Sequence, residues 1–443
     1  MQEGIKQYDY SLAKLFLLVC IATGFLGMLI GVVLAFQLAV PDLNYIAGEY
    51  SIFGRLRPLH TNVIIYGFTL SGIWAGWYYL GQRVLKITYH DHPFLKLVGM
   101  LHFFMFGSMA VRREKVIYIS LWYFIATFTA ISVLYIFNNL SVPTRLVTDY
   151  GSFWHSISMY AGTNDALIQW WWGHNAVAFV FTSGIIGLIY YFLPKESGQP
   201  VFSYKLTLFS FWSLMFVYIW AGGHHVIYST VPDWVQTLGS VFSVVLILPS
   251  WGTAVNMLLT MRGQWHQLKE SPLIKFLILA STWYMLATLE GPIQSIKSVN
   301  ALAHFTDWIV GHVHDAALGW VAFTIIASVY HMLPRLYGRE IYSKKIIEAQ
   351  FWIMTIGIVF YFSTMWIAGI VQGMMWRDIT PLGQLKYSFI DTVAVLKPYF
   401  IMRGIGGLLY LVGFVMFIYN VVMTMVAART LNKEPEYASP MTS

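Results

Sequence analysis

Six histidines fall in four short motifs of a kind that could bind metal ions. Neutral imidazole is the commonest metal ligand in proteins and suits both iron and copper. The motifs are R-L-R-P-L-H-T-N, W-W-W-G-H-N, Y-I-W-A-G-G-H-H and D-W-I-V-G-H-V-H, which supply His60, His174, His224, His225, His312 and His314. The last two are two residues apart, so on a helix their side chains would point about 200° apart and could serve two sites.

The segments that must position these histidines are strongly apolar. Of the 443 residues, 58% are hydrophobic and 11% are charged, whereas a soluble domain carries about 25% charged residues. Runs of the roughly 20 apolar residues that a membrane-spanning helix needs lie near 15–40, 59–81, 116–138, 168–193, 206–230, 236–260, 274–293, 308–334, 350–375 and 404–427. We therefore expect an all-α, polytopic bundle of ten spanning helices in one domain, 1–443, with a polar cytoplasmic tail, 430–443. No internal repeat is evident.

One further apolar run, from Leu97 to Val111, is too short to cross the membrane. Its 15 residues would reach about 22 Å as a helix, against a hydrocarbon core of about 30 Å. If it does not cross, 19 of the 27 basic residues face one side; if it does, the division becomes 11 against 16. Because basic residues collect on the cytoplasmic side, we expect ten crossings with both termini cytoplasmic.

Under this topology, each of the six histidines lies within about nine residues of the outer end of its helix. A lone intramembrane histidine is often a packing residue, and that alternative stands for each one taken singly. Six imidazoles at one depth on four helices instead indicate metal sites. They divide into two for a haem held on both faces, one for a haem with an open iron position, and three for a copper. The remaining histidines are expected in loops or packing: His90, His92, His102, His155, His266, His304 and His331.

Cysteine usage limits what the chain can bind by itself. Its one cysteine, Cys20, lies in the first apolar run, so a disulfide, an iron–sulfur cluster and a C-x-x-C-H haem attachment are all excluded within the chain. A covalently bound haem would have to sit on a partner. The net charge of +7 does not indicate nucleic-acid binding, because the basic residues are scattered among short loops.

The four motifs, their order and the sequence between them resemble the catalytic subunit of the cbb3-type cytochrome c oxidases, the C family of haem–copper oxidases. The likeness extends over nearly the whole chain. It includes V-P-D-W-V-Q-T-L after the histidine pair and L-E-G-P-I-Q-S-I-K-S-V-N before the last histidine motif. It implies a subunit I fold and reduction of O2 to water with electrons from cytochrome c, coupled to proton uptake and translocation. Implied partners are membrane-anchored mono-haem and di-haem c-type cytochromes in a bacterial inner membrane, with the metal centres toward the periplasm.

The resemblance also implies which histidine serves which metal. His60 and His314 resemble the axial ligands of a low-spin haem b, and His312 resembles the proximal ligand of a high-spin haem b. The family's three copper ligands match His174, His224 and His225. The implied cofactors are thus two haem b groups and one copper ion.

Further residues match the family's pattern around these metals. Tyr218 resembles its redox tyrosine, which is joined covalently to the copper ligand that corresponds to His174. Glu290 matches an acid near the proximal histidine, and Arg57 resembles a residue near a haem propionate.

Helical spacing supports the tyrosine assignment. Tyr218 precedes His225 by seven residues, about 700° of helical rotation, so both lie on nearly the same face. A packing tyrosine is the alternative. The same helix carries hydroxyls at steps of three or four residues below Tyr218, and Tyr190 lies near the inner end of the preceding helix. The family's proton channel uses this region, so we expect a proton path through Tyr190, Ser203, Thr207, Ser210 and Ser213.

The chain departs from the family in one region. The family has twelve helices, and in this chain its third and fourth are compressed into the segment from His92 to Val111. Either a helix pair has been lost, or residues of the natural chain are missing from this sequence. Two crossings are removed together in both cases, so the orientation of the later helices is kept. The missing outer loop carries acids that in the family help to hold a calcium ion at the haem propionates, which leaves open whether this chain binds calcium.

Two other functions compete with oxygen reduction. A nitric oxide reductase is a relative that uses a non-haem iron near carboxylates, but the helix bearing His174 has no acid from Ala166 to Pro194, and Ala178 occupies the next turn. A histidine-lined transporter without redox metals is the second alternative. An optical difference spectrum would separate it from an oxidase.

Overall fold

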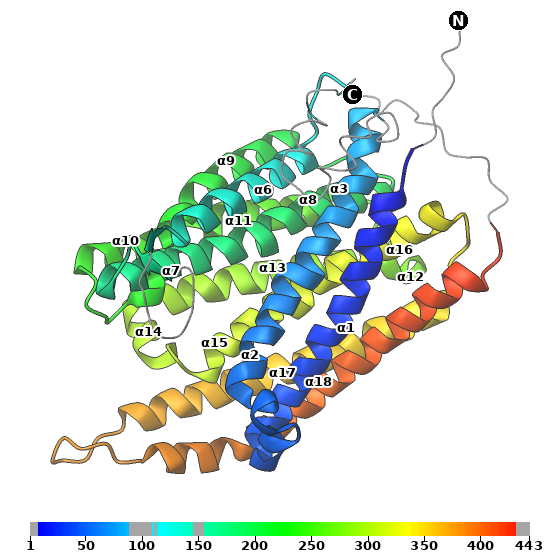
Figure 1. The fold of residues 1–443 in the computed structure, drawn as a ribbon. Coiled ribbons are helices and arrows are strands. Elements are labelled where there is room, and N and C mark those ends of the chain that lie inside the picture. Colours follow the sequence, from blue (N-terminus) through cyan, green and yellow to red (C-terminus); the bar gives the residue numbers. More distant parts are fainter. Residues whose placement is uncertain (1–7, 88–108, 110–111, 113, 145–154, 431–443) are drawn as a thin grey trace, which may run out of the picture.

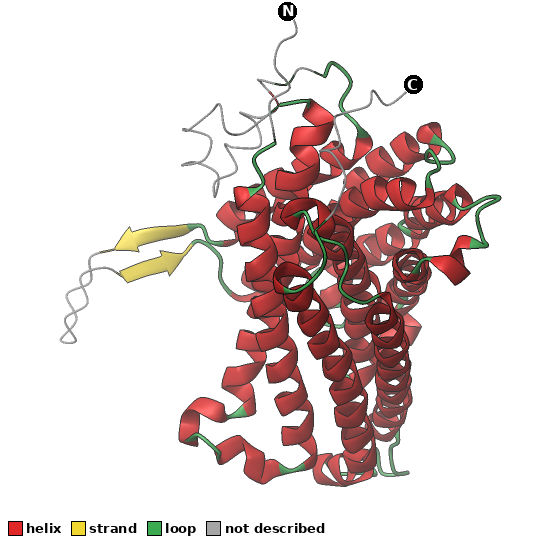
Figure 2. Cartoon of the chain, turned by 90° about the vertical axis from the view of Figure 1, so that its right-hand side faces the viewer, coloured by secondary structure: helices red, strands yellow, loops and turns green. Residues whose placement is uncertain are grey.

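The protein is a bundle of long helices with one short β-ribbon (Figures 1 and 2). The computed structural model describes residues 8–87, 109, 112, 114–144 and 155–430. Within these residues, nine helices are long and apolar enough to cross a membrane: Ser11–Ala39, Ile119–Asn138, Gly162–Ser197, Tyr204–Val226, Asp233–Thr260, Pro272–Ser295, Asp307–Tyr337, Lys344–Arg377 and Phe389–Val426. The predicted all-α membrane bundle is confirmed.

The expected span at 59–81 lies in a helix that runs without a break from Phe53 to Leu85 and packs beside the first helix. The elements in chain order are α1 (Ser11–Ala39), η1 (Pro41–Tyr45), η2 (Gly48–Ser51), α2 (Phe53–Asn62), η3 (Val63–Thr69), α3 (Leu70–Leu85), α6 (Ile119–Asn138), β1 (Ser141–Thr144), β2 (His155–Ser158), α7 (Gly162–Val177), η5 (Ala178–Gly184), α8 (Ile185–Ser197), α9 (Tyr204–Ala221), η6 (Gly222–Val226), α10 (Asp233–Val245), α11 (Ile247–Thr260), α12 (Gln267–Glu270), α13 (Pro272–Ser295), α14 (Lys297–Ala303), α15 (Asp307–His314), η7 (Asp315–Ala322), α16 (Phe323–Tyr337), α17 (Lys344–Arg377) and α18 (Phe389–Val426).

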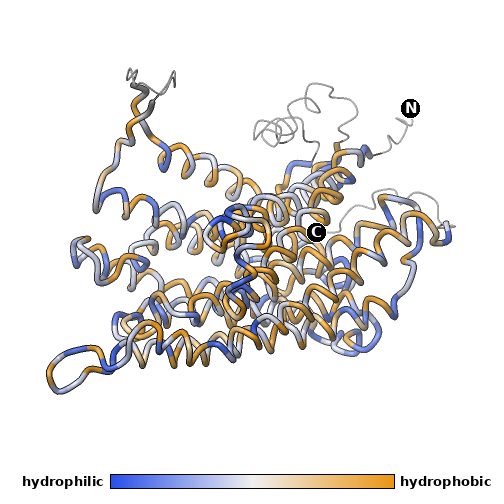
Figure 3. The backbone as a smooth tube through the Cα atoms, turned by 60° about the horizontal axis from the view of Figure 1, so that its bottom comes forward, coloured by the Kyte–Doolittle hydropathy of each residue, from blue (hydrophilic) through white to orange (hydrophobic). Residues whose placement is uncertain are grey.

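Hydropathy follows the helices closely. Figure 3 shows apolar residues along the helical segments and hydrophilic residues at the connecting turns. Serine side chains accept a backbone N–H in the first turn of α9, α13, α17 and α18, and so satisfy a donor that would otherwise lack a partner. These caps fix where the helices begin.

The proposed tail, 430–443, and the short segment 97–111 lie almost entirely outside the described residues.

Three helices that carry candidate ligands share a local distortion. Each widens into a π-helix within a turn after its histidine: η3 follows His60, η5 follows His174, and η7 follows His314. Such segments are rare and occur frequently at functional sites. They mark the same depth on three helices that come from different parts of the chain.

Two structures extend from the bundle at the end that holds the histidine motifs. One is the antiparallel ribbon of β1 and β2, which projects sideways in Figure 2. The other is the hairpin formed by α17 and α18. The 34 residues of α17 reach about 51 Å as a helix, well beyond a hydrocarbon core of about 30 Å. The hairpin extends beyond the neighbouring helices (Figure 1), as expected of a segment that continues outside the membrane.

The structure contains a repeated unit at the opposite end of the bundle. Asn256 binds the backbone of Ser203 in both directions, with its Oδ1 2.9 Å from the serine N and its Nδ2 3.0 Å from the serine O. Asn420 binds Ser343 in the same way, at 3.1 and 3.0 Å. Each asparagine also donates to a tyrosine hydroxyl, at 3.4 and 3.3 Å respectively.

The two units also correspond in sequence. Residues 193–203 read L-P-K-E-S-G-Q-P-V-F-S, and residues 333–343 read L-P-R-L-Y-G-R-E-I-Y-S. Gly198 and Gly338 end their helices in the left-handed region, at φ of 66° and 62°. The asparagine therefore fastens the start of a helix to the bundle twice, once at α9 and once at α17. A polar group that occurs in both units belongs to the shared scaffold. A polar group that occurs in one unit alone is a better candidate for a functional role.

Candidate metal centres

Three histidines from two helical segments form a compact cluster. A ligand nitrogen of each of His174, His224 and His225 lies within 4.8 Å of the others. His174 comes from α7, and the other two come from η6, where the 3-10 turn at the end of α9 presents consecutive imidazoles. The ring of Trp170 stacks on His225 with centroids 4.5 Å apart.

Hydrogen bonds fix which nitrogens face the centre of the cluster. The Ser243 hydroxyl donates to Gly239 O at 2.6 Å, so it accepts from His224 Nδ1 and leaves His224 Nε2 free. His174 Nδ1 and His225 Nε2 lie 3.3 Å apart. Two nitrogens bound to one metal at about 2.0–2.1 Å in a trigonal arrangement would be about 3.5 Å apart. The cluster therefore fits a single metal ion held by three imidazoles.

Tyr218 lies next to this cluster. Its ring centroid is 5.4 Å from that of His174, and its hydroxyl is 3.2 Å from Thr182 Oγ1. His174 Nε2 is buried and has no hydrogen-bond partner, although its Nδ1 faces His225. The Tyr218 ring is therefore close to an imidazole that has one nitrogen without a partner.

His60 and His314 form a second pair of candidate ligands. Their ring centroids are 6.3 Å apart and their planes differ by 8°. His60 Nδ1 donates to Gly27 O at 2.7 Å, and His314 Nδ1 donates to Val310 O at 2.8 Å, so both Nε2 atoms are left free. Imidazoles on opposite sides of one metal at about 2.0–2.1 Å would have centroids about 6 Å apart. The pair therefore fits a metal bound on two opposite faces.

Glycines on the neighbouring helix allow this approach. A Cβ at Gly31 would lie 2.8 Å from His60 Cε1, and Gly27 supplies the carbonyl that orients the ring. A larger side chain at Gly31 would displace the imidazole. The ring centroid of Tyr361, on α17, lies 4.8 Å from that of His314.

His312 is on the same short helix as His314, two residues before it. Its Nδ1 is 3.4 Å from Glu290 Oε2, while Glu290 Oε1 accepts from Trp308 Nε1 at 2.6 Å and from Gln294 Nε2 at 3.3 Å. The carboxylate is thus held by α13 and α15 beside the histidine, although neither Glu290 Oε2 nor His312 Nδ1 has a hydrogen-bond partner. A Cβ at Gly291 would lie 3.3 Å from His312 Nε2. The glycine therefore leaves space at the nitrogen that could bind a metal.

Two buried charged groups near the histidines were not predicted as site residues. Asp315 is fully buried beside Glu290 and His312, and neither of its oxygens has a hydrogen-bond partner. Arg403 is buried on α18 and lies 3.4 Å from Asp307 Oδ1. Charges at membrane depth are rare and usually functional. Asp315 stands inside the apolar run 308–334 and Arg403 directly precedes the run 404–427, so both positions were usable signals in the sequence.

The expected proton path is partly connected in the structure. Tyr190 and Thr207 are joined through Asn256 Nδ2, at 3.4 and 2.9 Å, and Ser203 binds the same asparagine through its backbone. Ser210 is fully buried and its hydroxyl has no partner. Ser213 donates to a backbone carbonyl of its own helix. Asn256 is the connecting residue that helical spacing alone did not identify.

The other predicted residues are more dispersed. Arg57 is exposed, one turn before His60 on α2. His331 is buried and pairs with Glu196, so it is a packing residue as expected. His304 stacks on Phe305 between α14 and α15, and its partial burial lowers its pKa. His90, His92 and His102 lie outside the described residues, as does most of the compressed region from His92 to Val111.

Comparison with known proteins places the chain in a family. The sequence profile described as "Cytochrome C and Quinol oxidase polypeptide I" matches residues 11–111 and 94–409. The chain belongs to this family. "Cytochrome c oxidase subunit 1 homolog" of Azorhizobium caulinodans is 40% identical, over 97% of this chain and 85% of the relative. "Cbb3-type cytochrome c oxidase subunit CcoN1" of Stutzerimonas stutzeri is 39% identical, over 95% of this chain and 96% of the relative. The predicted resemblance is confirmed.

A solved structure supports the same fold. It is described as the cryo-EM structure of a heme-copper terminal oxidase dimer, with a TM-score of 0.74 and 16% identity over 97% of this chain and 86% of that chain. The alignment with the Azorhizobium relative runs over 472 positions, more than the 443 residues of this chain. The relative therefore contains segments that this member of the family lacks. Membership of the family implies haem and copper, and the chain is an integral membrane protein.

Proposed function

We propose that the chain is the catalytic subunit of a cbb3-type terminal oxidase, which reduces O2 to water with electrons from cytochrome c. The observation that carries this proposal is the cluster of His174, His224 and His225, with the Tyr218 ring beside His174. These three histidines would hold a copper ion and His312 would hold a haem, and the two groups together would supply the site at which O2 binds.

The donor sets support three cofactors. His60 and His314 would hold a low-spin haem b, His312 would hold a high-spin haem b, and the three-histidine cluster would hold one copper ion. When bound, these groups supply the electron transfer and the site at which O2 binds. The two carbonyl contacts of His60 and His314 keep their rings in the tautomer that offers Nε2 to a metal. Arg57, one turn from His60, would face a propionate.

The protein's own residues orient ligands and move protons at this site. Glu290 accepts from Trp308, and its other oxygen lies 3.4 Å from His312 Nδ1. A hydrogen bond between these two atoms in the metal-loaded protein would orient the imidazole and increase its basicity as a ligand. Tyr218 holds a proton at its phenolic oxygen, within hydrogen-bond distance of Thr182. That proton and one electron from the ring are available where the O–O bond is broken.

Protons would reach Tyr218 from the opposite end of the bundle. Tyr190, Ser203 and Thr207 gather around Asn256 at that end, and Ser210 lies one turn further along α9. The unpartnered hydroxyl of Ser210 offers both a donor and an acceptor to an intervening water. Ser213 continues the series toward Tyr218.

Electrons would come from membrane-anchored c-type cytochrome partners. The single cysteine is buried in α1, so the chain cannot attach haem c by itself. The histidine end would face the periplasm of a bacterial inner membrane and the termini would face the cytoplasm, because this arrangement places most basic residues on the cytoplasmic side. Proton uptake from that side would couple the reaction to the membrane potential.

Purified complex tests the proposal directly. Two b-type haems and one copper per chain, with O2 consumption driven by reduced cytochrome c, are the expected result. A nitric oxide reductase would instead contain a non-haem iron and consume nitric oxide. Among the described residues, Glu290 and Asp315 lie beside His312, and the group formed by His174, His224 and His225 contains no acid. A second non-haem iron in place of copper would overturn the proposal.

A further inference from the structure

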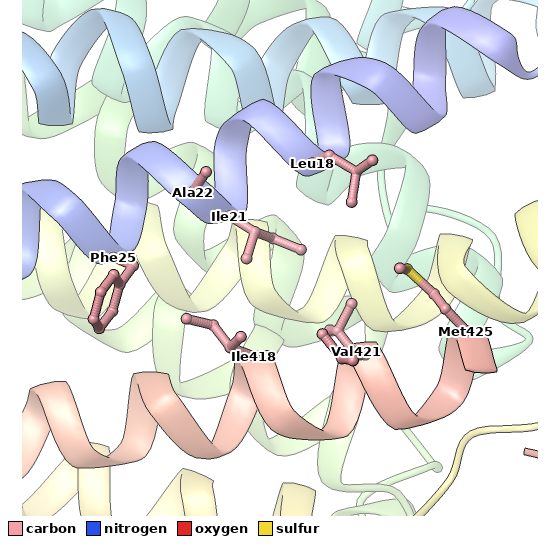
Figure 4. A pocket seen from close by; sticks show the side chains of 8 residues that line it. Leu18, Ile21, Ala22, Phe25, Ile418, Val421 and Met425 are labelled. Carbon is pink, nitrogen blue, oxygen red and sulfur yellow. The ribbon is translucent and has the colours of Figure 1, made fainter. Parts of the chain in front are cut away.

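An apolar groove runs between the first and last described spanning helices (Figure 4). It has a volume of about 420 Å³, within the range of small-molecule sites. All of its lining side chains are apolar and come from α1 and α18: Leu18, Ile21, Ala22, Phe25, Ile418, Val421, Val422 and Met425. The groove is distinct from the metal centres, because it lies toward the end of the bundle opposite the histidines.

The groove opens toward the surroundings of the bundle. Leu18 and Val422, one on each wall, are 45% and 44% exposed, whereas Ile21 and Val421 are buried at its floor. Both helices are long and apolar enough to span the membrane, so the medium at this depth is lipid. The small side chain of Ala22 leaves room between the walls (Figure 4). An extended hydrocarbon chain matches such an elongated, wholly apolar site.

Basic residues stand at one end of the groove. Lys14 precedes Leu18 by four residues on α1, about 6 Å along the axis and on the same face. Arg429 follows Met425 by four residues, just after α18 ends. The helix ends are tied together here, because Lys14 Nζ lies 4.9 Å over the Tyr337 ring and Arg339 Nη1 donates to Ala428 O at 2.7 Å.

Neither basic residue is neutralised by the protein around it. Among the described residues, no carboxylate forms an ion pair with Lys14 or Arg429, and the Arg429 side chain is exposed. Two positive charges that lack an acidic partner, within a turn of an apolar groove, complement a negative headgroup attached to an acyl chain. A neutral or zwitterionic lipid would fill the groove but supply no net negative charge to these two residues.

We propose that this groove is a binding site for an anionic phospholipid. One acyl chain lies between α1 and α18, and the phosphate headgroup binds Lys14 and Arg429. The lipid then covers the apolar floor and joins the first and last described spanning helices at the membrane surface. This site is independent of the oxygen chemistry, so it stands or falls apart from the proposed function.

Native mass spectrometry of the whole oxidase complex tests the headgroup contacts. The complex is reconstituted in nanodiscs of equal phosphatidylglycerol and phosphatidylcholine, and retained lipids are counted after release. Wild type should retain phosphatidylglycerol in preference, and Lys14→Gln or Arg429→Gln should each lower its retention about fivefold. Lys345→Gln, an exposed basic residue at the same end but away from the groove, should have no effect. Equal retention of the two lipids by wild type would overturn the proposal.

A second pair of variants tests the acyl groove. Ala22→Trp fills it and should abolish retention of the lipid, while Leu26→Trp, at an exposed position outside the lining, should not. The haem spectrum of each variant shows that it has folded. A photoreactive amino acid at position 22 then identifies the occupant in native membranes. An adduct with phospholipid supports the proposal, whereas an adduct with a partner's spanning helix would show that a protein covers the groove.

Discussion

The imidazole rings of His60 and His314 face each other with their centroids 6.3 Å apart and their planes within 8° of parallel. One ring comes from the second spanning helix and the other from a helix some 250 residues later in the chain. Each is oriented by a backbone carbonyl, so both present Nε2 to the space between them. That space matches the width of one metal with two axial ligands.

We predict that His60→Ala and His314→Ala each abolish the spectrum of a six-coordinate low-spin haem, because a centre ligated by two imidazoles cannot survive the loss of either. His312→Ala should instead remove carbon monoxide binding and leave the low-spin spectrum largely intact. Reduced-minus-oxidised and carbon monoxide difference spectra of the purified variants measure both. A normal low-spin spectrum in His314→Ala would show that the two haems had been assigned to the wrong histidines.

Copper content should depend on the three-histidine cluster and on the residue that orients it. Replacing His174, His224 or His225 with alanine should lower copper per chain severely. Ser243→Ala should weaken copper retention by about tenfold, because it removes the acceptor that fixes the His224 tautomer. Metal analysis after dialysis against a chelator checks this. Unchanged copper in Ser243→Ala would mean that packing alone orients the ring.

Tyr218→Phe should retain both haems and copper but reduce oxygen consumption by about 100-fold or more. The ring remains, so the packing against His174 is kept, and only the phenolic group is lost. Oxygen uptake with reduced cytochrome c, set beside the haem spectrum of the same sample, gives the measurement. Full activity without the hydroxyl would contradict a role in catalysis.

A peptide map tests the covalent link separately. Bond formation between the Tyr218 ring and His174 Nε2 releases two protons and two electrons, which O2 can accept. The map of active enzyme should contain one joined peptide carrying both residues. Two unmodified peptides would refute the link.

Ser210→Ala should slow oxygen reduction without lowering thermal stability. The buried hydroxyl has no protein partner, so its removal leaves no other group unsatisfied. In the repeated unit, the position that corresponds to Ser210 is Gln350, which binds Tyr330, so the serine is not part of the shared scaffold. Thr69→Val removes another buried, unpartnered hydroxyl and serves as the control. Turnover equal to that of wild type in Ser210→Ala would remove this residue from the proton path.

The segment from Leu97 to Val111 should not span the membrane, so that positions 83 and 113 lie on the same cytoplasmic side. Single cysteines at these two positions, labelled from either side in membrane vesicles, measure sidedness. Labelling from opposite sides would contradict both the topology and the pairing of His60 with His314.

The intact mass of the subunit distinguishes two forms of this chain. A mass of 50.7 kDa corresponds to the chain of 443 residues. A mass several kilodaltons higher would indicate a natural chain with the further helix pair that the family resemblance predicts.

The amino-acid sequence was sufficient for the fold class and the identity of the candidate ligands. A membrane span needs a long apolar run, which can be read locally, and all nine long apolar helices found among the described residues coincide with such runs. The candidate metal ligands can also be recognised from short stretches of sequence, since each of the six histidines lies in a distinctive motif near a helix end. Orientation followed from basic residues counted along the chain and remains a prediction.

Only the tertiary structure decided how the side chains around these ligands are arranged. Two contacts illustrate this: Asn256 binds Ser203, and Glu290 binds Trp308. The partners in each pair belong to different helices, and they meet because those helices pack at particular rotations. The expectation of no internal repeat missed the short correspondence between residues 193–203 and 333–343, which becomes recognisable once Asn256 and Asn420 are seen to bind Ser203 and Ser343 in the same way. Burial of Arg403 and the tautomer of His224 likewise depend on neighbours from distant segments. Helical periodicity fixes which face a residue occupies, but the partner on that face is set by the packing of the whole bundle.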